Sequence, residues 1–126
     1  MKQQEGAFNM LTREEVFEYV RKNYGTEPDY PWKKFPQYAV LRHSSGSWYG
    51  IIMNVLPENL GLEGTDKIDI LNLKCLPEIN DSLRNGYNVF PGYHMNKEHW
   101  ISLVLERTDA QGDVYNLIEQ SFHLTK

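Results

Sequence analysis

The first regular pattern of apolar and polar residues begins shortly after a polar opening segment. From Val16 to Tyr24, apolar residues recur at the spacing that places them on one side of a helix. Thr12 and Glu15 have the spacing of a capping box, in which each side chain binds the backbone amide of the other residue. Gly25 suits the end of such a helix, because glycine readily adopts the left-handed conformation. The pattern predicts a surface helix between Thr12 and Gly25 that covers a core.

The pattern then changes to that of extended chain and strands. Prolines recur through residues 27–36, which predicts an extended loop, and we expect its aromatic residues to cover a sheet edge. The apolar runs at residues 38–43 and 48–56 flank a cluster of serine and glycine, as in a β-hairpin. Residues 67–76 alternate between apolar and polar side chains except at residues 70–71, which indicates a bulge or a strand buried on both faces.

The last third of the chain predicts a helix, a strand and a second helix. A proline suits the first position of a short helix over residues 77–84, while residues 87–93 have no regular pattern. Residues 99–106 alternate as a strand does, with three side chains on one face: Trp100, Ser102 and Val104. Asp109 is placed to cap a helix over residues 110–124, whose expected buried side chains are Val114, Leu117, Ile118 and Phe122.

The order of these elements is helix, three strands, helix, strand, helix. Consecutive strands joined by turns favour an antiparallel sheet, and helices on one face of that sheet make a two-layer sandwich of the α+β class. We predict a single domain over residues 10–126, preceded by a flexible N-terminal lead-in at residues 1–9.

The size and composition agree with a single globular domain. The chain has 126 residues and a mass of 14.8 kDa, and 40% of its residues are hydrophobic and 24% charged. The lone cysteine, Cys75, excludes a disulfide within the chain and a zinc site of several cysteines. Because the sequence has neither an apolar run of about 20 residues nor a secretory signal, we expect a cytoplasmic protein with no membrane partner.

The balance of charged residues bears on whether the protein binds nucleic acid. Lys and Arg total 13 against 17 Asp and Glu, which gives a formal net charge of -4 and a pI near 5.5. A protein that depends on phosphate contacts usually has a basic excess or a basic stripe. The balance therefore counts against a strong nucleic-acid binder, although a local basic face is compatible with it.

Residues 91–100 hold the densest group of chemically active side chains, including histidines, a lysine, an asparagine and aromatic rings. A metal site at His94 and His99 would need a third ligand, for which the candidates are Glu98, His43 and His123. No pattern in the sequence brings any of these candidates to the histidine pair. We therefore predict no metal and no cofactor.

The motifs of nucleophilic and phosphate chemistry are missing from the sequence. Cys75 lies in a predicted strand beside leucines, so we expect it to be buried and inert. No Gly-x-Ser-x-Gly sequence and no glycine-rich phosphate loop occur. These observations predict no catalytic residue and no enzymatic activity.

Residue types suited to nucleic acid also occur in and around residues 91–100. Phosphates can be contacted by Arg42, Lys74, His94 and Lys97, and bases can stack on Trp48, Tyr93 and Trp100. Asn96 can contact the nucleic-acid backbone or a base. The alternative is a structural turn that Asn96 caps, with His99 as the third residue after it and Trp100 in the core. Both interpretations remain open from the residues alone.

Several stretches of the chain resemble the MmcQ/YjbR family of small bacterial proteins. The most characteristic is YHMNKEHWI at residues 93–101. The supporting stretches are VFEYV at 16–20, YAVLR at 38–42, WYGII at 48–52, DILNLKC at 69–75 and SF at 121–122. The resemblance covers nearly all of the chain from Met10 to Leu124.

The resemblance implies a compact α+β fold similar to that of the frataxin-like CyaY proteins. It also implies the DNA-binding role usually given to the family, and it brings no catalytic reaction. Carried onto this sequence, the family motifs imply six nucleic-acid-binding residues: Lys74, His94, Asn96, Lys97, His99 and Trp100.

The functional expectation is weak, mostly sequence-nonspecific binding of nucleic acid, in particular DNA, by those residues together with Arg42. The alternative is a protein-interaction or small-ligand module without catalytic activity. In that case the aromatic residues of the loop at residues 30–35, together with Trp48 and Tyr49, would form an exposed apolar patch.

Overall fold

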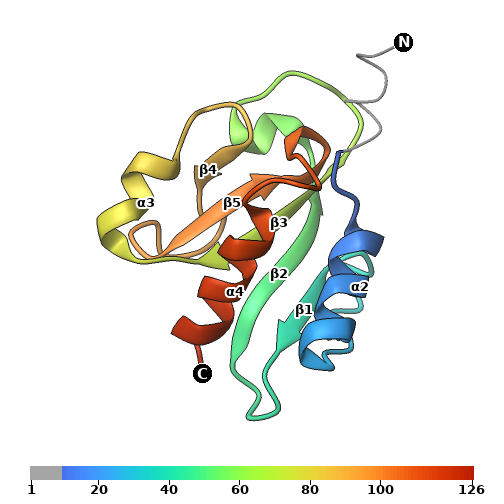
Figure 1. Cartoon of the computed structure of the whole chain (residues 1–126). Coiled ribbons are helices and arrows are strands. Elements are labelled where there is room, and N and C mark those ends of the chain that lie inside the picture. The colour runs from blue at the N-terminus through green and yellow to red at the C-terminus, as the bar shows by residue number, and fades with distance from the viewer. Residues whose placement is uncertain (1–9) are drawn as a thin grey trace.

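The computed structural model describes residues 10–126 and contains a five-stranded antiparallel sheet with the strand order β1-β2-β3-β5-β4 (Figure 1). The α+β class with helices against an antiparallel sheet is thereby confirmed. The predicted lead-in at residues 1–9 lies outside the described residues. The strands are β1 Ala39–Arg42, β2 Trp48–Val55, β3 Ile68–Lys74, β4 Val89–Pro91 and β5 Trp100–Val104. The helices are α2 Arg13–Tyr24, α3 Pro77–Leu83 and α4 Val114–Leu124, with short 3-10 turns η1 Pro57–Leu60 and η2 Leu105–Arg107.

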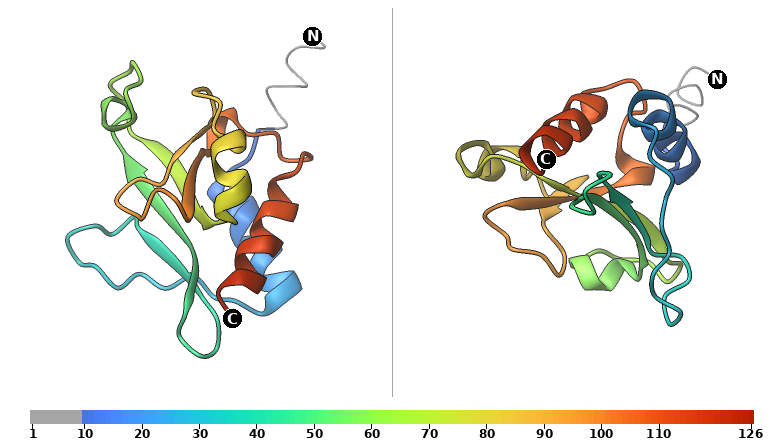
Figure 2. Two further views of the ribbon diagram at one scale, coloured as in Figure 1. Left: turned by 90° about the vertical axis from the view of Figure 1, so that its left-hand side faces the viewer. Right: turned by 90° about the horizontal axis from the view of Figure 1, so that it is seen from below.

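Helices α2 and α4 lie side by side on one face of the sheet, where they cover the larger hydrophobic core (Figure 2). The predicted capping box begins α2: the Glu15 amide donates to Thr12 Oγ1 at 3.2 Å, and the Thr12 amide donates to Glu15 Oε1 at 3.0 Å. Gly25 ends this helix with a φ of 69°. The local signals read from the sequence therefore place α2 correctly.

The opposite face of the sheet is covered by η1 and by loops (Figure 2). Aromatic and apolar side chains from these loops pack on a second core: Trp32, Tyr38, Leu60, Leu62, Tyr93 and Met95. The central strands are therefore buried on both faces, which explains the break in alternation at residues 70–71. Strand β3 keeps a regular register there, and the irregularity of the sheet lies between Leu41 and Arg42 instead.

Two sequence expectations for the last third of the chain are wrong. The segment at residues 87–93 contains strand β4, which pairs with β5 and makes the fifth strand. Helix α4 begins at Val114, because the Asp109 carboxylate accepts the Gln111 amide at 2.9 Å in a preceding turn rather than capping the helix. In α4, Val114 and Ile118 are buried as expected, and the remaining predicted side chains, Leu117 and Phe122, are partly buried against the core.

Candidate functional site

The register of the sheet brings several predicted site residues to one end of the face opposite α2 and α4. Arg42 at the end of β1 pairs with Trp48 at the start of β2, and Lys74 at the end of β3 pairs with Trp100 at the start of β5. Alternation along β3 and β5 places Lys74 and Trp100 on the face that also carries Ile70. The residues that join β4 to β5, residues 92–99, lie at the same end, and we call them the corner loop.

A buried polar network fixes the start of the corner loop. Asn72 and Ser102 are fully buried on neighbouring strands, and the Ser102 hydroxyl donates to Asn72 Oδ1. The Tyr93 amide donates to Ser102 Oγ at 2.8 Å, and Asn72 Nδ2 donates to the Tyr93 carbonyl oxygen at 2.9 Å. Both backbone polar groups of Tyr93 are thus satisfied inside the protein, as buried polar groups require.

Helix α3 and the end of β3 hold the corner loop from another side. Asn80 Nδ2 donates to the Trp100 carbonyl oxygen at 3.2 Å, and Arg84 donates to Asn80 Oδ1 at 2.8 Å and to the Lys97 carbonyl oxygen. The Cys75 amide donates to the His99 carbonyl oxygen at 2.8 Å. Arg84 was missed in the sequence, because its contact with the loop spans 13 residues and no local pattern signals it.

Within the loop, the turn predicted from Asn96 is confirmed. Asn96 Oδ1 accepts the amides of Glu98 at 2.9 Å and His99 at 3.1 Å. Gly92 lies so close to β5 that a Cβ atom there would be 2.7 Å from the Cβ of Trp100. Trp100 itself is partly exposed, so the expectation that it lies in the core is wrong.

Some cationic groups at this end of the sheet already form hydrogen bonds or ion pairs within the protein, and others do not. The Arg42 guanidinium binds Asp29 at 2.8 Å and lies 5.5 Å from the Trp48 ring centre, and Lys97 Nζ donates to the Gly92 carbonyl oxygen at 2.6 Å. By contrast, Lys74 Nζ has no hydrogen bond or ion pair with any residue in 10–126. The His94 and His99 rings likewise form no hydrogen bond within that range, although the His94 ring lies 4.1 Å from the Tyr93 ring. Of the Lys and Arg side chains at this end that were predicted as site residues, Lys74 is therefore the one whose charged group is not already engaged within residues 10–126.

An aromatic pocket of about 230 Å³ adjoins the corner loop. Its lining residues are Trp32, Phe35, Tyr38, Trp48, Ile51, Met53, His94 and Met95. The Trp32 and Trp48 rings meet edge to face at 5.7 Å, and the Phe35 and Tyr38 rings stack at 4.7 Å. Of the residues expected in an exposed apolar patch, Trp32, Phe35 and Trp48 line this pocket, whereas Tyr30 is exposed but not among its lining residues. Tyr49 is fully buried on the helix side and donates its hydroxyl to Thr26 at 2.7 Å, so its place in the patch is wrong.

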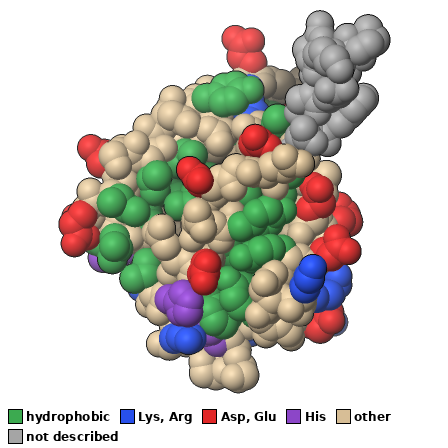
Figure 3. Space-filling view, in the orientation of Figure 1, with side chains coloured by type: hydrophobic (Ala, Val, Ile, Leu, Met, Phe, Trp, Pro, Cys, Tyr) green, Lys and Arg blue, Asp and Glu red, His purple; other side chains and the backbone are tan. Residues whose placement is uncertain are grey.

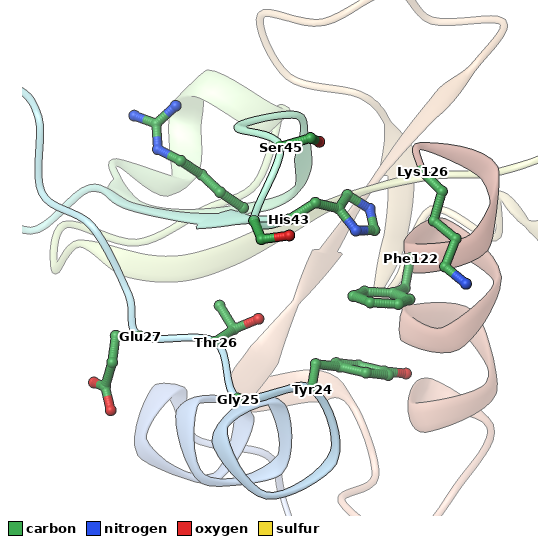
Figure 4. Close-up of a pocket in the computed structure, with 10 residues that line it drawn as sticks. Tyr24, Gly25, Thr26, Glu27, His43, Ser45, Phe122 and Lys126 are labelled. Carbon is green, nitrogen blue, oxygen red and sulfur yellow. The ribbon is translucent and has the colours of Figure 1, made fainter.

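A larger cleft of about 590 Å³ lies between the C-terminal ends of α2 and α4 and the β1–β2 turn (Figure 4). Tyr24 stacks on Phe122 at 4.0 Å, and His43 lies 4.3 Å from the same ring. Burial lowers the pKa of His43, whose Nε2 is 2.8 Å from Thr125 Oγ1. These side chains join α4 to the sheet, and the cleft includes only Arg42 of the predicted site residues.

The metal and thiol alternatives depend on how the candidate side chains are placed within residues 10–126. No group of three or more His, Cys, Asp or Glu side chains in 10–126 lies close enough together to hold a metal ion. Burial raises the pKa of the Cys75 thiol, and Asn80 donates to its Sγ at 3.3 Å. The thiol is buried, as the sequence predicts, and it is kept in the unreactive protonated form.

The fold and the site define a small α+β protein with two helices on one face of an antiparallel sheet and a tightly held loop beside an aromatic pocket on the other. The chain belongs to the YjbR family, whose model matches residues 21–124. The resemblance seen in the sequence is thereby confirmed.

Similar proteins agree with this family membership. The chain is 71% identical over 118 residues to the Bacillus subtilis (strain 168) protein named "Uncharacterized protein YyaQ", covering 93% of this chain and 100% of that protein. A Pseudomonas syringae protein solved by crystallography has a TM-score of 0.88 and 43% identity, over 92% of this chain and 100% of that one.

A third protein shares the fold alone. Protein DR2400 of Deinococcus radiodurans, with a domain described as DUF419, has a TM-score of 0.68 and 21% identity, over 92% of this chain and 79% of that one. Within residues 10–126, no helix is both long enough and apolar enough to cross a membrane.

Proposed function

We propose that this protein binds nucleic acid weakly and with little sequence preference through the face opposite α2 and α4. The observation that supports this proposal is the gathering of Arg42, Lys74 and the corner loop at one end of that face, next to exposed aromatic rings. Cations that contact phosphates and rings that stack on bases are the two components of such a surface.

Part of the negative charge behind the net value of -4 lies away from the proposed surface, although Glu98 of the corner loop is exposed and Asp29 is paired to Arg42. Figure 3 views the molecule from the side of α2 and α4, where acidic side chains are spread over the surface. Exposed carboxylates on those helices include Glu14, Glu15, Glu18 and Glu119. They lie on the far side of the sheet from the corner loop, so water and salt screen them from a ligand bound there.

Few phosphate contacts imply a shallow dependence on salt. Each phosphate neutralised on duplex DNA contributes about 0.9 to the slope of log K against log salt concentration. Arg42 is already paired to Asp29, and the Lys97 ammonium already donates to the Gly92 carbonyl oxygen, so both must share or exchange a partner to contact a phosphate. Lys74 alone of the three contacts a phosphate without such a loss. We therefore expect low affinity that is lost near physiological salt.

The replacement Lys74→Ala tests this proposal most cleanly, because the Lys74 ammonium has no structural partner in residues 10–126. We expect it to weaken binding of every sequence alike and to lower the salt slope by about 1. Fluorescence anisotropy with a labelled oligonucleotide at several salt concentrations measures both effects. Lys22→Ala on the exposed side of α2 is the matched control and should bind as the wild type does. No binding at low salt, or an equal loss in both variants, would contradict the proposal.

The aromatic pocket favours a second candidate, a small-ligand or protein-interaction module that likewise acts by binding rather than by catalysis. Its lining is almost entirely apolar and it opens beside the half-exposed ring of Phe35. A rise in melting temperature with a flat aromatic metabolite, but not with DNA, would favour this candidate. A rise with oligonucleotide that disappears in high salt would favour nucleic acid.

A further inference from the structure

The aromatic pocket has the size and lining for one flat ring. Its volume of about 230 Å³ is below the range of roughly 300–1,000 Å³ typical of sites for drug-sized ligands. Three aromatic rings line it, with Trp32 meeting Tyr38 at 6.2 Å and Trp48 at 5.7 Å, both edge to face. The β2 residues Ile51 and Met53 add apolar side chains to the lining. A planar heterocycle can therefore stack there without leaving a large void.

Cationic groups flank this pocket on two sides. On one side the Arg42 guanidinium lies 5.5 Å from the Trp48 ring. On the other, the stacked Phe35 and Tyr38 rings separate the pocket from a second hollow of about 270 Å³, which both rings also line together with Lys34 and Lys67. Asp29 already balances much of the Arg42 charge, so Lys34 and Lys67 supply the stronger positive charge and Arg42 a partial one. This arrangement favours a neutral ring that carries negative charge on each side.

A base within a nucleic-acid strand is such a ring, because a phosphate follows on each side of it. In a duplex the base is stacked and paired, and removing it from the stack costs free energy. In a single strand the base is already accessible, and stacking on an aromatic side chain gains affinity for any of the bases.

We propose that the aromatic pocket receives one unpaired base of a single strand, with the adjoining phosphates near Arg42 and near Lys34 and Lys67. This inference rests on the proposed function and adds to it that single strands bind more tightly than duplexes. It assigns to Trp32 and Phe35 a role in base stacking and to Lys34 and Lys67 a role in phosphate contact.

Three probes of equal length separate the contributions of bases, phosphates and base pairing to affinity. They are an oligothymidine, the same strand with abasic sites throughout, and a duplex. By anisotropy at low salt, we expect the oligothymidine to bind about tenfold more tightly than the abasic strand. Trp32→Leu should remove that difference. Phe35→Ala tests the same point at a ring that is 47% exposed and therefore tolerant of replacement. Tyr87→Leu, an exposed ring outside the pocket, is the control and should leave the difference intact.

The outcomes distinguish a failure of base binding in the pocket from a failure of the proposed nucleic-acid binding on which it rests. Salt-dependent binding of all three probes that is weakened by Lys74→Ala, with equal affinity for oligothymidine and abasic strand, would overturn the inference and leave the proposed function standing. A difference that survives in both folded pocket variants, checked by circular dichroism, would overturn it as well. The absence of binding to any probe at low salt would overturn both.

Discussion

Ser121 joins α4 to the sheet through one hydroxyl. Its Oγ donates to the Tyr49 carbonyl oxygen at 2.6 Å and accepts the Lys74 amide at 2.9 Å. The paired register of β2 and β3 ends at Gly50 and Leu73, so this hydroxyl bridges the two strands where their own hydrogen bonds stop. Ser121 is fully buried, and water therefore cannot replace it.

Ser121→Ala should lower the free energy of unfolding by about 1–3 kcal/mol, because it leaves two buried backbone groups without a partner. Urea denaturation followed by circular dichroism measures this loss. The neighbouring Gln120→Ala, at an exposed position of α4, is the control and should change stability by less than about 0.5 kcal/mol. Equal stability of the two variants would show that the bridge is not needed.

Asp69 links β3 to the start of α2. Burial would raise the pKa of its carboxyl, but the two hydrogen bonds from Arg13, at 2.8 and 2.9 Å, and one from Asn54 at 2.8 Å hold that pKa below its ordinary value of 3.8. Because the folded-state pKa is the lower one, the carboxylate's contribution is complete above 3.8 and is lost as the pH falls through the folded-state value.

The stability advantage of the wild type over Asp69→Asn should therefore be constant near neutral pH and shrink in acid. Urea denaturation of both proteins at a series of pH values from 7 downward, in steps of about one unit, tests this dependence. An advantage that stays constant down to the most acid condition would contradict the assigned role of the carboxylate.

At the scale of elements, the corner loop takes its shape from strands and helices that surround it. Asn72→Ala removes the donor to the Tyr93 carbonyl oxygen and leaves the Ser102 hydroxyl without its acceptor. We expect a loss of about 1–3 kcal/mol in stability together with faster amide exchange at residues 93–99. Hydrogen exchange followed by mass spectrometry measures this local loosening against helix α2 as an internal reference. An equal increase of amide exchange in the corner loop and in helix α2 would show a loss of overall stability without local loosening, and would contradict this role of Asn72.

The sequence predicted those parts of the fold and the site whose defining contacts join residues close together in the chain. The helix after Thr12 and the turn at Asn96 were predictable, because the capping residues contact groups within three positions of themselves. Strand β4 was not, because it is three residues long and is defined by pairing with β5. The site shows the same division: the sequence indicated the cations of the corner loop, whereas the holding role of Arg84 and the approach of Trp32 to Trp48 depend on contacts across the fold.

At the scale of the whole molecule, the sheet separates two surfaces of different character. The side of α2 and α4 carries many of the exposed carboxylates, and the opposite side combines the corner loop, the aromatic pocket and lysines at its margins. The helices bury the larger core and thereby leave the other face to be closed by loops rich in aromatic residues. Both faces contribute to the folded core, and the proposed binding surface lies on the face that the loops close.

An NMR titration of the isotope-labelled 14.8 kDa chain with a short oligonucleotide at low salt tests the central claim most directly. The account predicts amide shift changes at residues 32–38, around Arg42 and Trp48, at Lys74 and through the corner loop, with the exposed residues of α2 unaffected. The changes should reverse on addition of salt. No change at low salt, or changes confined to the helix side, would contradict it.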